Sequence, residues 1–196
     1  PVRTGWLGEM RFGLINDIRS KEKSNYPLMI EQFAKLSINP IEDLNKQLND
    51  FKPDLIAMSS TEDMWELGIK ILKQAKDYKI KNNVPVLVGG VFPTFAPEIC
   101  FKDEMVDMVC VGEGENALLD LCKKIENKED FSDVTNLWVK KEGKLLKKNS
   151  ISKPVDINTS PKIDISIFEE NRLYRPMAGK VYKMFKVETI MGCPYN

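Results

Sequence analysis

Three short apolar runs, each ending in small residues, constrain the fold of this chain more than any other feature. They cover residues 54–59, 84–88 and 106–111, and none shows the polar alternation of a half-exposed strand. Helical apolar spacing follows the first run over residues 62–75 and the third over residues 117–125. Buried strands that alternate with helices predict an α/β fold, a Rossmann-like or flavodoxin-like doubly wound parallel sheet.

The segment before these runs carries weaker patterns. Residues 10–16 are compatible with a strand, and residues 26–36 with a short helix. Pro40 suits a first helical position, and the apolar spacing after it predicts a helix. That helix should end before Lys52–Pro53, because the residue before a proline disfavours helical backbone.

The pattern changes again after residue 130. Residues 136–141 and 144–149 flank Glu142–Gly143, which predicts a C-terminal β-hairpin. Residues 151–180 are rich in Pro, Asp, Ser and Arg and predict a linker without periodic structure. Residues 187–191 are typical of a new strand, so we expect the sequence to break off inside a larger protein. Four parts follow: an N-terminal segment packed on or completing the sheet (1–50), an α/β core (51–130), a hairpin and linker (131–185), and the first strand of a further domain (186–196).

The charge balance and the missing histidine exclude several functions. The 196 residues hold 29 Lys and Arg against 29 Asp and Glu, without the basic surplus that nucleic-acid binding favours. With no histidine, the chain offers no Ser-His-Asp or Cys-His pair and no imidazole ligand for a metal. No apolar run reaches the ~20 residues that cross a bilayer. We therefore expect a soluble, cytoplasmic domain that binds neither nucleic acid nor a membrane.

The cysteines form no C-x-x-C pair. Cys100, Cys110 and Cys122 lie in apolar or helical stretches, where a small buried thiol is the ordinary interpretation. A large, Lys-rich chain without a signal peptide does not suggest a disulfide framework. Cys193 stands apart, in a Gly-Cys-Pro-Tyr-Asn sequence directly after the last predicted strand. It is either an inert thiol or the first ligand of a cluster-binding loop.

The stretch after the second apolar run is the first candidate site. Gly89 and Gly90 are followed by Val91, Phe92 and, after a proline, Thr94. Adjacent glycines let a ligand approach the backbone closely, but they are also a common tight-turn device. The stretch matches neither the dinucleotide fingerprint nor the P-loop, so the pattern does not favour recognition of phosphate.

Hydroxyl and carboxylate side chains follow the other two runs. Ser59, Ser60 and Thr61 could donate hydrogen bonds to a ligand, or Ser60 or Thr61 could simply cap the next helix. The segment Gly112–Glu115 (Gly112, Glu113, Gly114, Glu115) could accept hydrogen bonds from a ligand. Its glutamates could equally be there because the helix dipole favours acidic residues in a first turn.

These stretches together resemble one family, the cobalamin-binding N-terminal domain of cobalamin-dependent radical S-adenosylmethionine enzymes. The similar blocks, in order, are residues 52–61 (KPDLIAMSST), 86–98 (VLVGGVFPTFAPE), 106–115 (VDMVCVGEGE) and 136–144 (NLWVKKEGK). Residues 164–182 resemble the linker to the radical domain, and residues 192–196 resemble the start of that domain's C-x-x-x-C-x-x-C loop. The resemblance covers about residues 50–196.

The resemblance implies that cobalamin lies across the carboxyl ends of the strands. Residues 59–61 would contact its tail or corrin amides, residues 89–94 would line the ring, and residues 112–115 would complete the rim. Cys193 would ligate a 4Fe-4S cluster that cleaves S-adenosylmethionine, in a C-terminal radical domain of the same polypeptide. The intact protein would then most often be a methyltransferase, and this chain alone would not be catalytic.

Two alternatives use the same fold. The chain could be a flavodoxin-like regulatory module that binds a nucleotide or a flavin, because fold alone does not fix function. It could also be an interaction domain whose strand-end motifs are only turns and caps. A bulky residue at Gly90 is expected to abolish corrin binding and to leave this last kind of domain unaffected.

Overall fold

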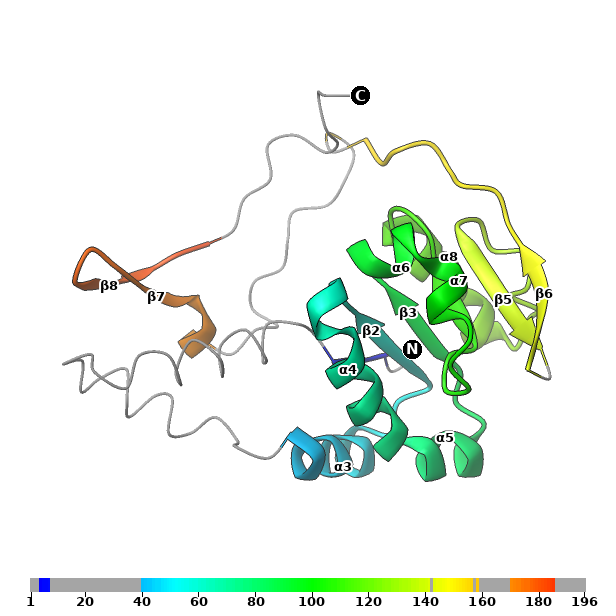
Figure 1. Ribbon diagram of the computed structural model, residues 1–196, viewed down its shortest axis with the longest axis horizontal. Helices are drawn as coiled ribbons and strands as arrows, with labels where there is room; N and C mark the ends of the chain where they lie inside the picture. The colour runs from blue at the N-terminus through cyan, green and yellow to red at the C-terminus, as the bar shows by residue number, and fades with distance from the viewer. Residues whose placement is uncertain (1–3, 8–39, 142, 157, 159–169, 186–196) are drawn as a thin grey trace.

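The computed structural model describes residues 4–7, 40–141, 143–156, 158 and 170–185 (Figure 1). A six-stranded sheet has its strands in chain order from β1 to β6. The parallel strands are β1 (Thr4–Leu7), β2 (Leu55–Ser59), β3 (Val86–Gly89) and β4 (Met108–Cys110), and the antiparallel pairings add β5 (Leu137–Lys141) and β6 (Lys144–Lys148). The helices are α3 (Pro40–Phe51), α4 (Glu62–Gln74), α5 (Lys76–Asn82), α6 (Val91–Phe95), α7 (Pro97–Cys100) and α8 (Glu115–Asn127).

Alternate strand residues form two separate cores, one on each face of the sheet. On one face, Ile56, Val88 and Val109 pack against apolar residues of α3 and α4. On the other face, Leu55 and Leu87 pack with residues of α8 and β5. Both faces are covered, which confirms the predicted α/β class and explains why the strands read as continuous apolar runs.

The connections explain which helix covers which face. The helices α3 and α4, which precede and follow β2 in the chain, both pack on one side of the sheet, as the general right-handed rule for crossovers between parallel strands predicts. The last helix, α8, joins the parallel strand β4 to the antiparallel strand β5, and it covers the other side. The carboxyl ends of β2, β3 and β4 therefore reach a common edge, at the top of the sheet in Figure 1 near α6.

The amino-terminal expectations are tested only in part. The helix predicted from Pro40 is confirmed as α3, which ends at Phe51. The strand that pairs with β2 on this side is β1, in which Thr4 lies opposite Leu55. It precedes the residues where a strand was expected. The expected strand at residues 10–16 and the expected helix at residues 26–36 lie outside the described residues.

The region after residue 130 follows the prediction at first and then departs from it. The hairpin β5–β6 is confirmed. The linker expected to lack regular structure contains, in its described part, η2 (Glu170–Leu173) and a second hairpin of β7 (Tyr174–Met177) and β8 (Lys180–Lys183). Its two-residue turn, Ala178–Gly179, has positive φ at both positions, a geometry that suits the twist of a hairpin. The strands are too short for their alternation to stand out in the sequence.

The expected strand at residues 187–191 lies outside the described residues. Within the part of the chain that the structure describes, no helix is long and apolar enough to cross a membrane.

Candidate functional site at the carboxyl edge of the sheet

Hydrogen bonds join the ends of β2 and β3. Ser59 and Gly89 are paired in register, and the Ser60 amide donates to the Gly89 carbonyl at 3.0 Å. The Ser60 carbonyl in turn accepts from the amide of Phe92 at 3.1 Å. The first two predicted motifs therefore form one continuous surface at the carboxyl edge of the sheet.

The Thr94 hydroxyl joins this surface to the end of β4. It donates to the Gly90 carbonyl at 2.8 Å and accepts from the Gly112 amide at 3.1 Å. One side chain thus satisfies a donor and an acceptor from two different loops. All three predicted motifs meet at this edge of the sheet, where open α/β sheets bind ligands.

Gly90 is required where β2 and β3 approach each other. Its φ is +96°, in the region that favours glycine. A β-carbon at this position would lie 2.6 Å from the Ser59 hydroxyl oxygen and 2.9 Å from the Ser60 backbone nitrogen. Any side chain would therefore strain the backbone, so the expectation that a bulky residue leaves a non-binding domain unaffected is wrong. Gly90 cannot discriminate between the two interpretations.

The three hydroxyls at the end of β2 have different roles. Ser60 is buried and donates to the Thr61 carbonyl at 2.9 Å. Thr61 occupies the N-cap position of α4, but its hydroxyl bonds to the Asp63 carboxylate and makes no cap hydrogen bond to the helix backbone. Ser59 is half-buried at the strand end. The structure therefore places Thr61 at the helix cap without the expected capping hydrogen bond.

The segment Gly112–Glu115 also serves two purposes. Glu115 is exposed and begins α8, as the helix-dipole interpretation expects. The Glu113 carboxylate instead accepts a hydrogen bond from the backbone amide of Val155, in the linker. Gly112, at the start of this segment, has a positive φ of +89°.

The short helix α6 presents apolar side chains to solvent. Val91 is 61% exposed and Phe95 is 83% exposed. Phe92 behaves differently, because it packs against the core and its ring lies 5.4 Å from that of Trp65. Sequence reasoning did not single out Phe95, although it lies inside the block that resembles the cobalamin-binding family. Phe95 follows Val91 by four residues, and this spacing was the sequence signal that both lie on one face of a helix.

The described cysteines are structural. Cys100, Cys110 and Cys122 are free thiols. Burial raises the pKa of Cys100 to about 12 and the pKa of Cys110 to about 11. These thiols stay protonated at neutral pH and are poor nucleophiles and poor metal ligands. The described residues hold no cluster of three or more His, Cys, Asp or Glu that could bind a metal, and Cys193 lies outside them.

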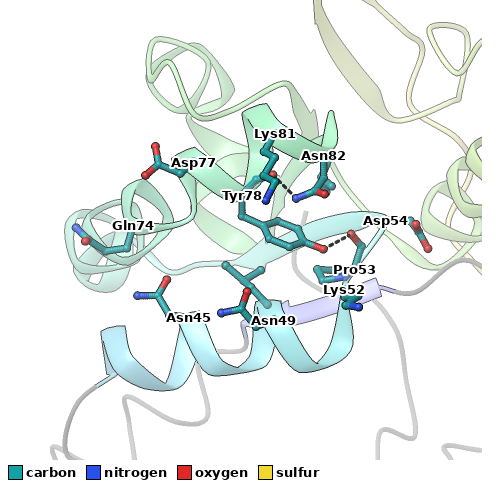
Figure 2. Close-up of a pocket in the computed structure, with 12 residues that line it drawn as sticks. Asn45, Asn49, Lys52, Pro53, Asp54, Gln74, Asp77, Tyr78, Lys81 and Asn82 are labelled. Carbon is teal, nitrogen blue, oxygen red and sulfur yellow. Dashed lines mark hydrogen bonds between the residues drawn. The ribbon is translucent and has the colours of Figure 1, made fainter.

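A depression of about 750 Å³ lies at the opposite edge of the sheet, between α3, α5 and the start of β2 (Figure 2). Lys52, Asp54, Asp77 and Lys81 contribute charged side chains of both signs to its wall. The Tyr78 hydroxyl donates to the Pro53 carbonyl at 3.4 Å across it. This depression borders the amino ends of the strands, away from the three strand-end motifs, and its size alone does not identify it as the ligand site.

Comparisons with known proteins indicate which proteins this chain is similar to. Residues 29–122 match the family model of the B12 binding domain. An uncharacterized methyltransferase, PH0819 of Pyrococcus horikoshii, is 28% identical over 155 residues, which cover 79% of this chain and 32% of that protein. The structure of the cobalamin-dependent S-adenosylmethionine radical enzyme OxsB, with aqua-cobalamin and S-adenosylmethionine bound, is 28% identical with a TM-score of 0.50. That alignment covers 59% of this chain and 16% of OxsB.

A shorter match concerns a different class of protein. Lipopolysaccharide heptosyltransferase 2 of Escherichia coli is 54% identical over 37 residues, which are 19% of this chain and 11% of that enzyme. Because so little of the enzyme is covered, this match says nothing about the activity of the chain.

These comparisons confirm the resemblance stated from the sequence. The chain matches the B12 binding domain model over residues 29–122, and 59% of it aligns with the structure of a cobalamin-dependent S-adenosylmethionine radical enzyme. The chain spans only part of these two proteins, 32% of PH0819 and 16% of OxsB.

Proposed function

We propose that this chain binds cobalamin at the carboxyl edge of its sheet, as the cofactor module of a radical S-adenosylmethionine enzyme. The observation that carries this proposal is the hydrogen-bonded junction of three strand-end loops, which lies within the residues matched by the B12 binding domain. A flat ring with amide substituents needs both an apolar surface and polar groups around it. The carboxyl edge offers both.

The described residues fit such a ligand. Val91 and Phe95 offer exposed apolar surface from α6. Ser59 and Thr61, at the carboxyl end of β2, are partly exposed and offer hydroxyls. Cobalamin, when bound, supplies a cobalt centre that can carry a methyl group. Because the chain has no histidine, none of its side chains can give that cobalt an imidazole ligand.

The remaining parts of the proposal concern the intact protein. We propose that it is a methyltransferase, in the class that PH0819 is named for. Cys193 would be one ligand of a 4Fe-4S cluster in a C-terminal radical domain that uses S-adenosylmethionine. The module alone would bind cofactor without turnover, and we propose that the protein is cytoplasmic.

The test is a titration of the full chain with hydroxocobalamin, followed by gel filtration with detection of corrin absorbance. We expect corrin to co-elute with the protein near one equivalent. The site is tested by a matched pair of substitutions that each place a carboxylate on an exposed apolar position. Val91→Glu lies on α6 at the carboxyl edge, and Leu119→Glu lies on α8, where Leu119 is 54% exposed.

We expect Val91→Glu to weaken cobalamin binding at least tenfold and Leu119→Glu to leave it within twofold of the unmodified chain. A protein peak without corrin would overturn the proposal. Equal affinities in the two variants would place the cofactor elsewhere. Flavin mononucleotide is titrated in parallel, since binding of flavin without corrin would favour the flavodoxin-like alternative.

A further inference from the structure

Asn136 is a buried polar residue between the end of β4 and the start of the linker, and it is 2% exposed. Its amide nitrogen Nδ2 donates to the Glu113 carbonyl at 2.7 Å and to the Ser152 hydroxyl at 3.1 Å. Its Oδ1 accepts from the Ser152 backbone amide at 2.6 Å. Every polar atom of this side chain therefore joins the β4 loop or the linker.

The backbone of Asn136 makes two further bonds of the same kind. Its carbonyl accepts from the Val111 amide at 2.9 Å, and its amide donates to the Ser150 carbonyl at 3.0 Å. The residue has a φ of +68°, a conformation that asparagine tolerates better than most residues. Asn136 thus bonds to four residues, two in the segment after β4 and two at the start of the linker, which is more than a simple turn requires.

Glu113 makes a second attachment to the linker. Its carboxylate accepts from the Val155 amide, and a hydrogen bond to a charged acceptor is stronger than one between neutral groups. Gly112 lies close to the linker as well, because a β-carbon there would be 3.5 Å from Ile151. Residues 150–155 are thus fastened to the loop that follows β4, where Figure 1 shows the chain, in yellow, leaving β6.

We propose that Asn136 and Glu113 form a clamp that fixes the start of the linker to the candidate cofactor site. Hydrogen bonds join Gly90 to Thr94 and Thr94 to Gly112, and Gly112 is the chain neighbour of Glu113 in this clamp. A ligand that orders the rim therefore also orders the linker. The clamp stands on its own contacts, whereas its coupling to the ligand rests on the proposed function.

The clamp is tested first on the full chain without ligand, by amide hydrogen exchange measured with NMR. We expect Glu113→Ala to speed exchange of the Val155 amide at least tenfold. The control is Glu66→Ala, which removes the same charge from an exposed position on α4 and should leave this rate unchanged. Rates of Val155 within twofold in both variants would overturn the clamp.

Two substitutions of Asn136 test its hydrogen bond to the Ser152 amide. Using two variants keeps the test valid if one of them does not fold. Asn136→Gly keeps the positive φ and removes the side chain, so the Ser152 amide should exchange at least tenfold faster. Asn136→Asp keeps an acceptor for the Ser152 amide but loses the donor to Glu113, so Ser152 should stay protected. Equal exchange of Ser152 in both variants would show that the side-chain oxygen does not hold the linker.

The coupling is tested by adding hydroxocobalamin to the same samples. We expect cobalamin to slow Val155 exchange severalfold in the unmodified chain and to have no such effect in Glu113→Ala. If cobalamin binds and Val155 exchange does not change, the coupling is wrong and the clamp stands. If cobalamin does not bind, the proposed function and the coupling are both wrong. The exchange rates measured without ligand still test the clamp.

Discussion

The two edges of the sheet are built from different chemical groups. At the carboxyl edge, backbone amides, carbonyls and hydroxyls connect the loops, and Thr94 bonds to two of them. At the amino edge, charged side chains make the connections. Lys79 bonds to the Asp107 carboxylate at 2.8 Å, and the other oxygen of Asp107 accepts from the Val86 amide at 2.8 Å.

This difference supports the proposal that a large ring binds at the carboxyl edge. The Lys79–Asp107 pair is mostly buried and already satisfied by the protein, and it fixes β3 beside β4. Burial lowers the pKa of Lys140 at the same edge, where its ammonium donates to the Asp103 carbonyl. The carboxyl edge instead leaves Val91 and Phe95 of α6 exposed. A ligand there need not displace an ion pair.

Among the substitutions that test this comparison of the two edges, Gly90→Ala should have the largest effect on stability. The positive φ and the contact with the Ser60 backbone should lower the free energy of unfolding by about 3 kcal/mol. Gly143→Ala is the matched control, because Gly143 has a φ of +75° but a β-carbon there would meet nothing within 4 Å. It should cost about 1 kcal/mol. Equal losses in urea unfolding would mean that close approach at Gly90 contributes nothing.

A smaller effect is expected from Asp107→Ala at the amino edge. The substitution leaves the Val86 amide and the Lys79 ammonium without their carboxylate, so we expect a loss of about 2 kcal/mol in stability. Cobalamin affinity should not change. In the control, Glu104→Ala breaks an exposed pair with Lys76 and should have no measurable effect on unfolding. Weakened cobalamin binding by Asp107→Ala would break the distinction between the two edges.

The smallest expected effect is that of Thr94→Val. The methyl group keeps the shape of the side chain but removes the hydroxyl that joins the β3 and β4 loops, which should cost about 1 kcal/mol. Cobalamin affinity should fall a fewfold, because the two loops lose their link. Thr94→Ser keeps the hydroxyl and should retain both properties. If Thr94→Val binds cobalamin as the unmodified chain does, the junction does not position the ligand.

The sequence predicted the elements better than their functional detail. The apolar runs predicted β2, β3 and β4 because strands buried on both faces need apolar side chains at every position. The hairpin β5–β6 was predicted because Glu142–Gly143 separates two strand-like stretches. The hairpin β7–β8 was missed because its strands of four residues carry too little pattern to stand out.

The candidate site shows the same division residue by residue. The sequence located Gly90, Thr94 and Gly112 as candidates because each follows a buried strand. It did not predict that the Thr94 hydroxyl joins the other two, because that contact links residues 18 positions apart. It also did not predict that the Glu113 carboxylate accepts a hydrogen bond from the Val155 amide, 42 positions away.

The sequence by itself determined the class of fold, the order of the motifs and the absence of any histidine ligand. These follow from local apolar pattern and from composition, which do not depend on distant contacts. Only the tertiary structure decided that Phe92 faces the core while Val91 and Phe95 face solvent. It alone also assigned Asn136 to the linker. Both depend on how distant segments pack, and the spacing of residues along the chain does not record that packing.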